Sequence, residues 1–139
     1  MNTYLNSALR AAAVGFAVLM TTRTASADPA APLMTRDLAG IPGKEAVMLT
    51  VEMVPGQASK PHRHDANVFV YVLEGTLTMQ VKGGAPVTLH PGDTYYESPT
   101  DVHTVSQNAS KTEPAKFLVF IVKDKGAPVT RPVAAEEPR

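Results

Sequence analysis

The chain has 139 residues, about the length of one domain. Hydrophobic residues make up 44% of it and charged residues 19%, a balance typical of a folded globular protein and too apolar for a disordered one. The 13 Lys and Arg residues equal the 13 Asp and Glu residues, so no basic excess is present to bind nucleic acid. The absence of cysteine excludes disulfide frameworks, thiolate zinc sites and cysteine nucleophiles.

Residues 1–27 are predicted to be a bacterial secretory signal peptide. Arg10 precedes a short apolar run over residues 11–20, and Ala25-Ser26-Ala27 forms a small-x-small cleavage pattern. The apolar run is too short to span a bilayer, which takes about 20 residues. We therefore expect a periplasmic or secreted protein with no membrane association after cleavage. The alternative is that residues 1–27 stay attached as an N-terminal helix or anchor.

The rest of the chain is predicted to form one β-rich domain over residues 45–125. An extended arm rich in Pro, Ala and Gly is expected before it, over residues 28–44, and a flexible tail after it, over residues 126–139. Short runs of β-forming residues between turn residues, arriving every 8–12 residues or so, favour an all-β sandwich or barrel with minimal helix. The predicted strands cover residues 46–54, 68–74, 76–82, 87–89, 94–97, 103–106 and 116–123.

Two of these strands are apolar on both faces, over residues 68–73 and 117–122. Because side chains alternate between the two sides of a strand, such runs need cover on both sides. One face can fill the interior of a barrel. We expect the other face to pack against a second sheet or a second subunit, so a homodimer is predicted.

Three of the four histidines lie in two short segments. His62 and His64 are two residues apart, so in an extended chain both imidazoles face the same side, as in a chelating pair. His103 follows much later, after a turn of its own. Imidazoles with a carboxylate or water select Fe, Mn, Zn, Ni or Cu. The alternative is that His62 and His64 are surface residues beside Arg63.

The segment around the first two histidines resembles the first motif of the cupin superfamily, G-x5-H-x-H-x3,4-E-x6-G. Gly56, His62, His64 and Gly75 stand at the required spacings. Val68 occupies the position of the glutamate that binds metal in the family. The chain is therefore similar to small single-domain bacterial cupins, with one expected ligand replaced by an apolar side chain.

The second cupin motif, G-x5-P-x-G-x2-H-x3-N, is matched in spacing around the third histidine. Gly92 and His103 are kept, whereas Ser98, Thr100 and Gln107 replace the family's Pro, Gly and Asn. The resemblance extends over about residues 47–122. It implies a single-domain jelly-roll β-barrel, often dimeric, with a metal held inside.

Carried over to this chain, the resemblance makes His62, His64 and His103 the expected ligands of a divalent transition metal. Because Val68 cannot coordinate, three outcomes stay open: three histidines plus water, a carboxylate from elsewhere, or an apolar pocket without metal. Glu97 is the candidate carboxylate, since it shares a strand face with Tyr95 just before the turn that leads to His103. An exposed carboxylate at a strand end is its alternative.

Two functions are carried forward from the sequence. The first is a metal-dependent enzyme of the dioxygenase type, an oxidoreductase acting on a small organic substrate, in which Glu97 is a ligand or general base. The second is a non-catalytic periplasmic protein that binds a metal or a small apolar ligand. A structural or partner-binding β-domain is a weaker third hypothesis.

Overall fold

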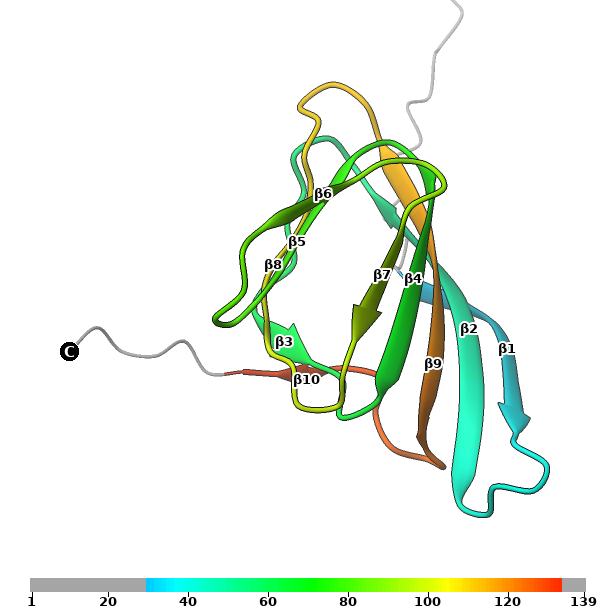
Figure 1. Ribbon diagram of the computed structural model, residues 1–139. Coiled ribbons are helices and arrows are strands. Elements are labelled where there is room, and N and C mark those ends of the chain that lie inside the picture. Colours follow the sequence, from blue (N-terminus) through cyan, green and yellow to red (C-terminus); the bar gives the residue numbers. More distant parts are fainter. Residues whose placement is uncertain (1–29, 134–139) are drawn as a thin grey trace, which may run out of the picture.

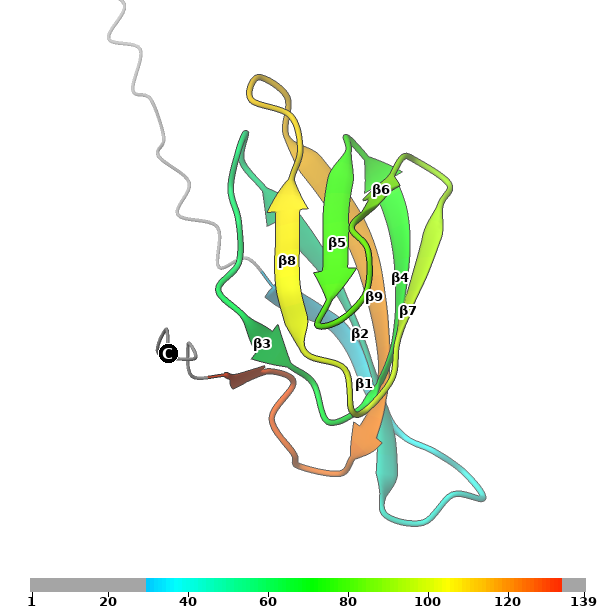
Figure 2. The same cartoon turned by 60° about the vertical axis from the view of Figure 1, so that its left-hand side comes forward.

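The computed structural model describes residues 30–133, which form ten β-strands in two five-stranded sheets (Figure 1). Every strand pairing between these residues is antiparallel. No helix occurs among them, so none of them could cross a membrane as a helix. The two sheets face each other and enclose one hydrophobic core (Figure 2). The predicted all-β jelly-roll barrel is thereby confirmed.

The first sheet has the strand order β1-β2-β9-β4-β7 and the second the order β10-β3-β8-β5-β6. The strands of the first sheet are β1 (Ala30–Asp37), β2 (Lys44–Met53), β9 (Ala115–Asp124), β4 (Asn67–Glu74) and β7 (Thr94–Glu97). Those of the second are β10 (Arg131–Pro132), β3 (His62–Arg63), β8 (His103–Asn108), β5 (Leu77–Val81) and β6 (Val87–Leu89). Most neighbouring strands, β3 and β8 among them, come from distant parts of the sequence, and the pairing of these two brings the histidine segments together.

The alternation of side chains in β4 fixes which face of the first sheet is inside. Val68, Val70 and Val72 are buried in the core, whereas Phe69 and Tyr71 are exposed. The same alternation runs along β9 from Phe117 to Ile121, whose odd-numbered residues are buried. Among residues 30–133 no second sheet covers the outer face, and its cover by a second subunit stays a prediction.

Gly75 ends β4 in a backbone conformation that only glycine adopts easily. Its φ is 77°, and a Cβ atom there would lie 2.7 Å from the Cα atom of Ala115 on β9. Any other residue would therefore push β4 away from its neighbour at this point. The glycine of the sequence motif is thus required by a turn and by a close approach of two backbones.

Both ends of the described chain form strands where the sequence predicts none. Residues 28–44 were expected to be an extended arm, but from Ala30 to Asp37 they pair with β2 as the edge strand β1. Residues 126–139 were expected to be a flexible tail, but Arg131 and Pro132 pair with β3. Backbone groups supply these pairings, so a composition rich in Pro and Ala gives no indication of them. The predicted signal peptide lies outside the described residues.

Candidate functional site

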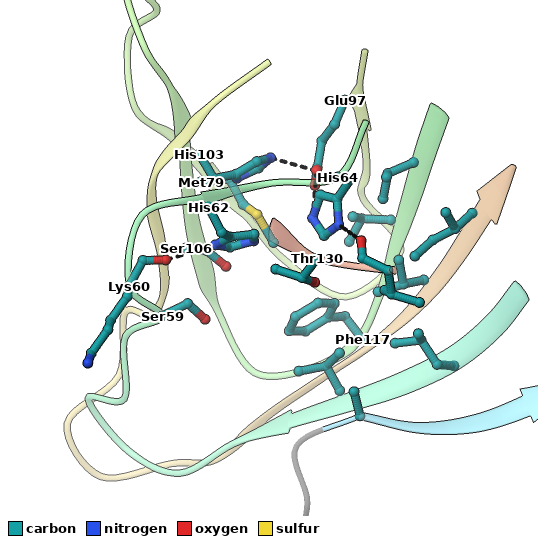
Figure 3. A pocket seen from close by; sticks show the side chains of 18 of the residues that line it. Ser59, Lys60, His62, His64, Met79, Glu97, His103, Ser106, Phe117 and Thr130 are labelled. Carbon is teal, nitrogen blue, oxygen red and sulfur yellow. Dashed lines mark hydrogen bonds and ion pairs between the residues drawn. The ribbon is translucent and has the colours of Figure 1, made fainter. Parts of the chain in front are cut away.

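The pairing of β3 with β8 brings the three predicted histidines together inside the barrel. His62 lies directly opposite His103 in the antiparallel register, and His64 follows on the same side of the chain. The ring centroids are 5.0 Å apart for His62 and His64, 5.2 Å for His62 and His103, and 5.9 Å for His64 and His103. Figure 3 shows the three rings facing a common space at one end of a pocket.

Glu97 joins this cluster from the other sheet. The register of β4 with β7 places it opposite Val68, the residue at the glutamate position of the first motif. Glu97 is only 4% exposed, and its Oε2 lies 2.6 Å from Nε2 of His103 and 3.3 Å from Nε2 of His64 (Figure 3). The expected alternative of an exposed strand-end carboxylate does not describe this geometry. A carboxylate on the neighbouring strand thus reaches the space beside Val68.

Two backbone carbonyls set the orientation and tautomer of two of the histidines. Nδ1 of His62 lies 2.8 Å from the carbonyl oxygen of Lys60, and Nδ1 of His64 lies 2.7 Å from that of Val129. A carbonyl oxygen only accepts, so each Nδ1 must carry the proton and donate it. Each Nε2 is then left with a free lone pair directed into the cluster. This is the arrangement found around histidines that bind metals.

Three polar atoms of the cluster are buried without a hydrogen bond of acceptable geometry. They are Oε2 of Glu97 and both ring nitrogens of His103. Oε2 of Glu97 and Nε2 of His103 lie close together, but the bond angles of a hydrogen bond are not met between them. Leaving buried polar atoms unpaired costs about 1–3 kcal/mol for each group. A cation bound to Oε2 of Glu97 and Nε2 of His103 would remove that cost for these two atoms.

The donor set fits a divalent transition metal in its chemistry, although the side chains are not closed around an ion position. Among residues 30–133 no group of three or more His, Cys, Asp or Glu side chains already has the arrangement of a metal site. Three imidazoles and one carboxylate suit Fe, Mn, Zn, Ni or Cu. The free Nε2 atoms and the unpaired Oε2 of Glu97 are the observations that support the fit.

Burial affects the protonation of His62. Desolvation lowers the pKa of this imidazole, and the nearby His64 and His103 lower it further, whereas the bond to the Lys60 carbonyl acts in the opposite direction. The net effect favours the neutral ring. A neutral imidazole is the form that can coordinate a metal.

The cluster lies at the wall of a cavity of about 480 Å³. The remaining wall is mostly apolar and comes from the inward faces of both sheets. It includes Val68, Val70, Met79, Phe117, Val119 and Ile121. The volume falls in the range of roughly 300–1,000 Å³ that small-molecule sites occupy in proteins.

The structure also shows contacts of the site that sequence reasoning missed. Val129, Thr130 and Pro132 line the cavity, and they belong to the segment predicted to be a flexible tail. Asp65 fixes this segment through an ion pair of 3.0 Å with Nε of Arg131, and it also pairs with Arg63. The contribution of Val129 to His64 comes from a backbone carbonyl, so no residue type in the sequence could have indicated it.

Comparison with known families decides the classification. A sequence model described as "Cupin domain" matches residues 49–121, more than half of the chain. The chain belongs to the cupin family. The resemblance noted from the two motifs is thereby confirmed, and both cupin motifs lie within the matched range.

Solved structures with the same fold share little sequence with this cupin. A Klebsiella pneumoniae protein with a double-stranded β-helix domain is 19% identical, with a TM-score of 0.58 over 73% of this chain and 84% of that one. The DMSP lyase DddQ of Ruegeria pomeroyi is 20% identical, with a TM-score of 0.57 over 67% of this chain and 45% of that one. The polyketide cyclase RemF of Streptomyces resistomycificus is 22% identical, with a TM-score of 0.54 over 66% of this chain and 63% of that one. At these identities the likeness shows the fold alone, and a comparison with curated proteins finds no match.

Proposed function

We propose that this cupin binds one divalent transition metal through His62, His64 and His103 and acts as a dioxygenase-type enzyme on a small organic molecule. The observation that carries the proposal is the meeting of three imidazoles and the buried Glu97 carboxylate at the wall of an apolar cavity. Fe, Mn, Zn, Ni and Cu are all compatible with this donor set.

The protein side chains have separate tasks in this proposal. A bound metal would supply Lewis acidity and open positions for substrate and O2. The carbonyls of Lys60 and Val129 hold two of the rings in the ligand tautomer. Glu97 serves as the fourth ligand or, if it stays free, accepts a proton from the substrate at Oε2. The buried side chain of Val68 excludes water from the side of the cluster where the glutamate of the family motif would stand.

Several structural neighbours are enzymes, but their reactions differ from one another. A DMSP lyase, a polyketide cyclase and an oxalate oxidase share the fold, so similar barrels serve unrelated reactions. A fold shared at such low identity is an analogy, and the site has to carry the argument for any particular chemistry. The site supports metal chemistry on a substrate that enters an apolar cavity.

A non-catalytic periplasmic protein that binds a metal or an apolar ligand is the second candidate function. The apolar wall around Val68 and Val70 favours it, because a dry cavity retains apolar molecules without any reaction. Both candidates place the protein outside the cytoplasm, which follows from the predicted signal peptide over residues 1–27. Cleavage after Ala27 is the expected result of N-terminal sequencing of protein recovered from the periplasm or medium, and an intact Met1 end would contradict export by this route.

Metal content and oxygen consumption distinguish the two functions. Protein purified from its native compartment should contain about one metal ion per chain, and it should take up O2 with a member of a panel of phenols, thiols and diketones. The variant His103→Ala should lose the metal, whereas His90→Ala, which changes an exposed histidine, should retain it. Bound metal without oxygen uptake would support the binding role, and absence of metal would refute the metalloenzyme.

A further inference from the structure

We propose that residues 128–133 form a movable strap that opens and closes the mouth of the cavity and supports His64 only when it is closed. The strap lies between the turn after β9 and the end of the described chain, and it includes β10. Its control of the mouth is independent of what the cavity binds. Its effect on His64 rests on the proposed metal site and adds control of the entry and release of the ion.

The strap forms one side of the mouth. Most residues that line the cavity are buried or half-buried, and the few that are exposed to solvent mark where the cavity opens. They lie at the start of β1, over residues 59–61 and on the strap. Among the described residues these exposed lining positions are Ala30, Ser59, Lys60, Pro61, Thr130 and Pro132. Figure 1 shows the strap crossing from the end of β9 in the first sheet to β3 in the second. Movement of the strap away from β3 therefore widens the mouth.

The near end of the strap is anchored firmly. Nζ of the buried Lys123 donates to the carboxylate of Glu45 and, at 2.6 Å, to the carbonyl oxygen of Ala127. The backbone N–H of Gly126 donates to the same carboxylate at 3.1 Å, and the φ of 74° at this glycine belongs to the turn after β9. The chain is thus fixed up to Ala127, and the strap pivots there.

The far end is held by few bonds. Two residues of the strap, Arg131 and Pro132, pair with β3, and a proline has no N–H to donate. The N–H of Val133 donates to the carbonyl of Pro61 at 3.3 Å. Arg131 forms an ion pair of 3.0 Å with Asp65, but its side chain is 56% exposed, and exposed ion pairs contribute little. In contrast, β9 pairs with β2 along ten residues. The strap can therefore detach while the barrel stays folded.

The strap connects the mouth to the histidine cluster. Pro128 and Pro132 restrict its backbone, so the segment between them moves as a unit. Val129 lies in this segment, and its carbonyl accepts the bond from Nδ1 of His64 at 2.7 Å. The open strap admits a molecule or an ion and at the same time removes the bond that fixes the tautomer of His64. The closed strap narrows the mouth and restores that bond.

Labelling of a cysteine inside the cavity tests the movement of the strap without any metal. The chain has no cysteine, and Ser106→Cys places one thiol at a buried lining position. In metal-free protein, its rate of reaction with methyl methanethiosulfonate measures how often the mouth opens. Adding Arg131→Ala removes the ion pair with Asp65 and should raise this rate by about two- to fivefold, the scale of an exposed ion pair.

The matched control removes a cation far from the strap. Lys116→Ala breaks a partly exposed ion pair with Glu52 on the first sheet, and in the Ser106→Cys background it should leave the labelling rate unaltered. An unchanged rate in the Arg131→Ala variant would overturn the proposal. Equal acceleration by the two variants would overturn it as well, because that result indicates loosening of the whole fold.

A cross-link between the strap and β3 tests the effect on the metal. Arg63 and Arg131 lie directly opposite each other, so Arg63→Cys with Arg131→Cys can form a disulfide between the two strands. Mn²⁺ is the suitable ion, because thiolates bind it poorly. The oxidised protein should release Mn²⁺ to a chelator at least tenfold more slowly than the reduced protein. Thr78→Cys with Thr88→Cys places the same cross-link between β5 and β6, and its two forms should release the ion at equal rates.

The two experiments separate the strap from the metal site. If neither Mn²⁺ nor Zn²⁺ binds while labelling still responds to Arg131→Ala, the metal proposal fails and the strap stands as a gate of the cavity. If the ion binds but the oxidised and reduced proteins release it equally fast, the metal site stands and the proposed coupling of the strap to His64 is wrong.

Discussion

At the scale of single residues, the main departure from the cupin pattern is the origin of the carboxylate. It comes from Glu97, whereas the family's glutamate position holds Val68. The two residues lie opposite each other on β4 and β7, so the carboxylate comes from the neighbouring strand and still reaches His103. The sequence predicted Glu97 as the candidate from its strand face alone. It could not predict the pairing with Val68, because register between strands depends on contacts distant in the sequence.

Removal of the carboxylate tests its role as a ligand. Glu97→Gln keeps the shape of the side chain but removes its charge, and we expect it to weaken metal binding by at least tenfold, the scale seen when supporting groups of a metal site are lost. Competition with a chelating dye measures the affinity. An unchanged affinity would remove Glu97 from the metal site.

Moving the carboxylate from position 97 to position 68 supplies the control for this prediction. Glu97→Val should also weaken metal binding, and adding Val68→Glu to that variant should restore it, because the carboxylate then stands at the position used by the family. A double variant that binds no better than Glu97→Val would mean that the two positions do not reach the same space.

At the scale of elements, strand pattern and turn residues predicted the barrel well and its two ends poorly. The expected strands 87–89 and 94–97 coincide with β6 and β7, and the other predicted strands end within about two residues of the observed ones. The strand β10 consists of two exposed residues, one of them a proline, so nothing in its composition indicates a strand. Its partner β3 is equally short, and the two strands are held by their pairing with each other and by the pairing of β3 with β8.

The segment that follows β9 is expected to position His64. It is held by Lys123, whose Nζ donates to the carbonyl of Ala127 at 2.6 Å and to the buried Glu45, and by the ion pair between Asp65 and Arg131. Asp65→Asn removes the ion pairs with Arg131 and Arg63 but tolerates the positive φ of 50° at this residue. We expect a loss of metal affinity of up to about fivefold, the scale of an exposed ion pair.

A second readout and a matched variant make this prediction specific. In metal-free Asp65→Asn protein, nitrogen NMR of His64 should show loss of the single tautomer with the proton on Nδ1. Asp37→Asn breaks a similar exposed ion pair, with Lys125. It should change neither the metal affinity nor the tautomer of His64. If both variants behave alike, the segment does not position His64.

At the scale of the whole molecule, the outer face of the first sheet carries a row of apolar side chains. The strand registers align Met34, Met48, Phe120, Phe69 and Tyr96 across five strands. Phe69 is 47% exposed and Tyr96 is 52% exposed. Contiguous apolar surface of this kind marks interaction sites in proteins. We propose that a second copy of the chain covers it, in agreement with the expectation of a homodimer.

A charge in the middle of this row tests the dimer. Phe69→Lys should convert a dimer into a monomer in light scattering, because the lysine would be buried without a partner in the interface. Thr104→Lys, on an exposed position of β8 in the other sheet, should leave the dimer intact. A wild-type protein that is monomeric at every concentration would contradict the proposed interface.

The proposed metal site requires three imidazoles and one carboxylate to meet around a single ion. Anomalous scattering from a crystal soaked with Zn²⁺ or Mn²⁺ measures the ion's position directly. We predict one strong peak bonded to Nε2 of His62, His64 and His103, with Glu97 as a fourth ligand or within hydrogen-bond reach of the ion's water. A crystal with no peak in the barrel, or a peak that leaves out His103, would contradict the proposed metal site.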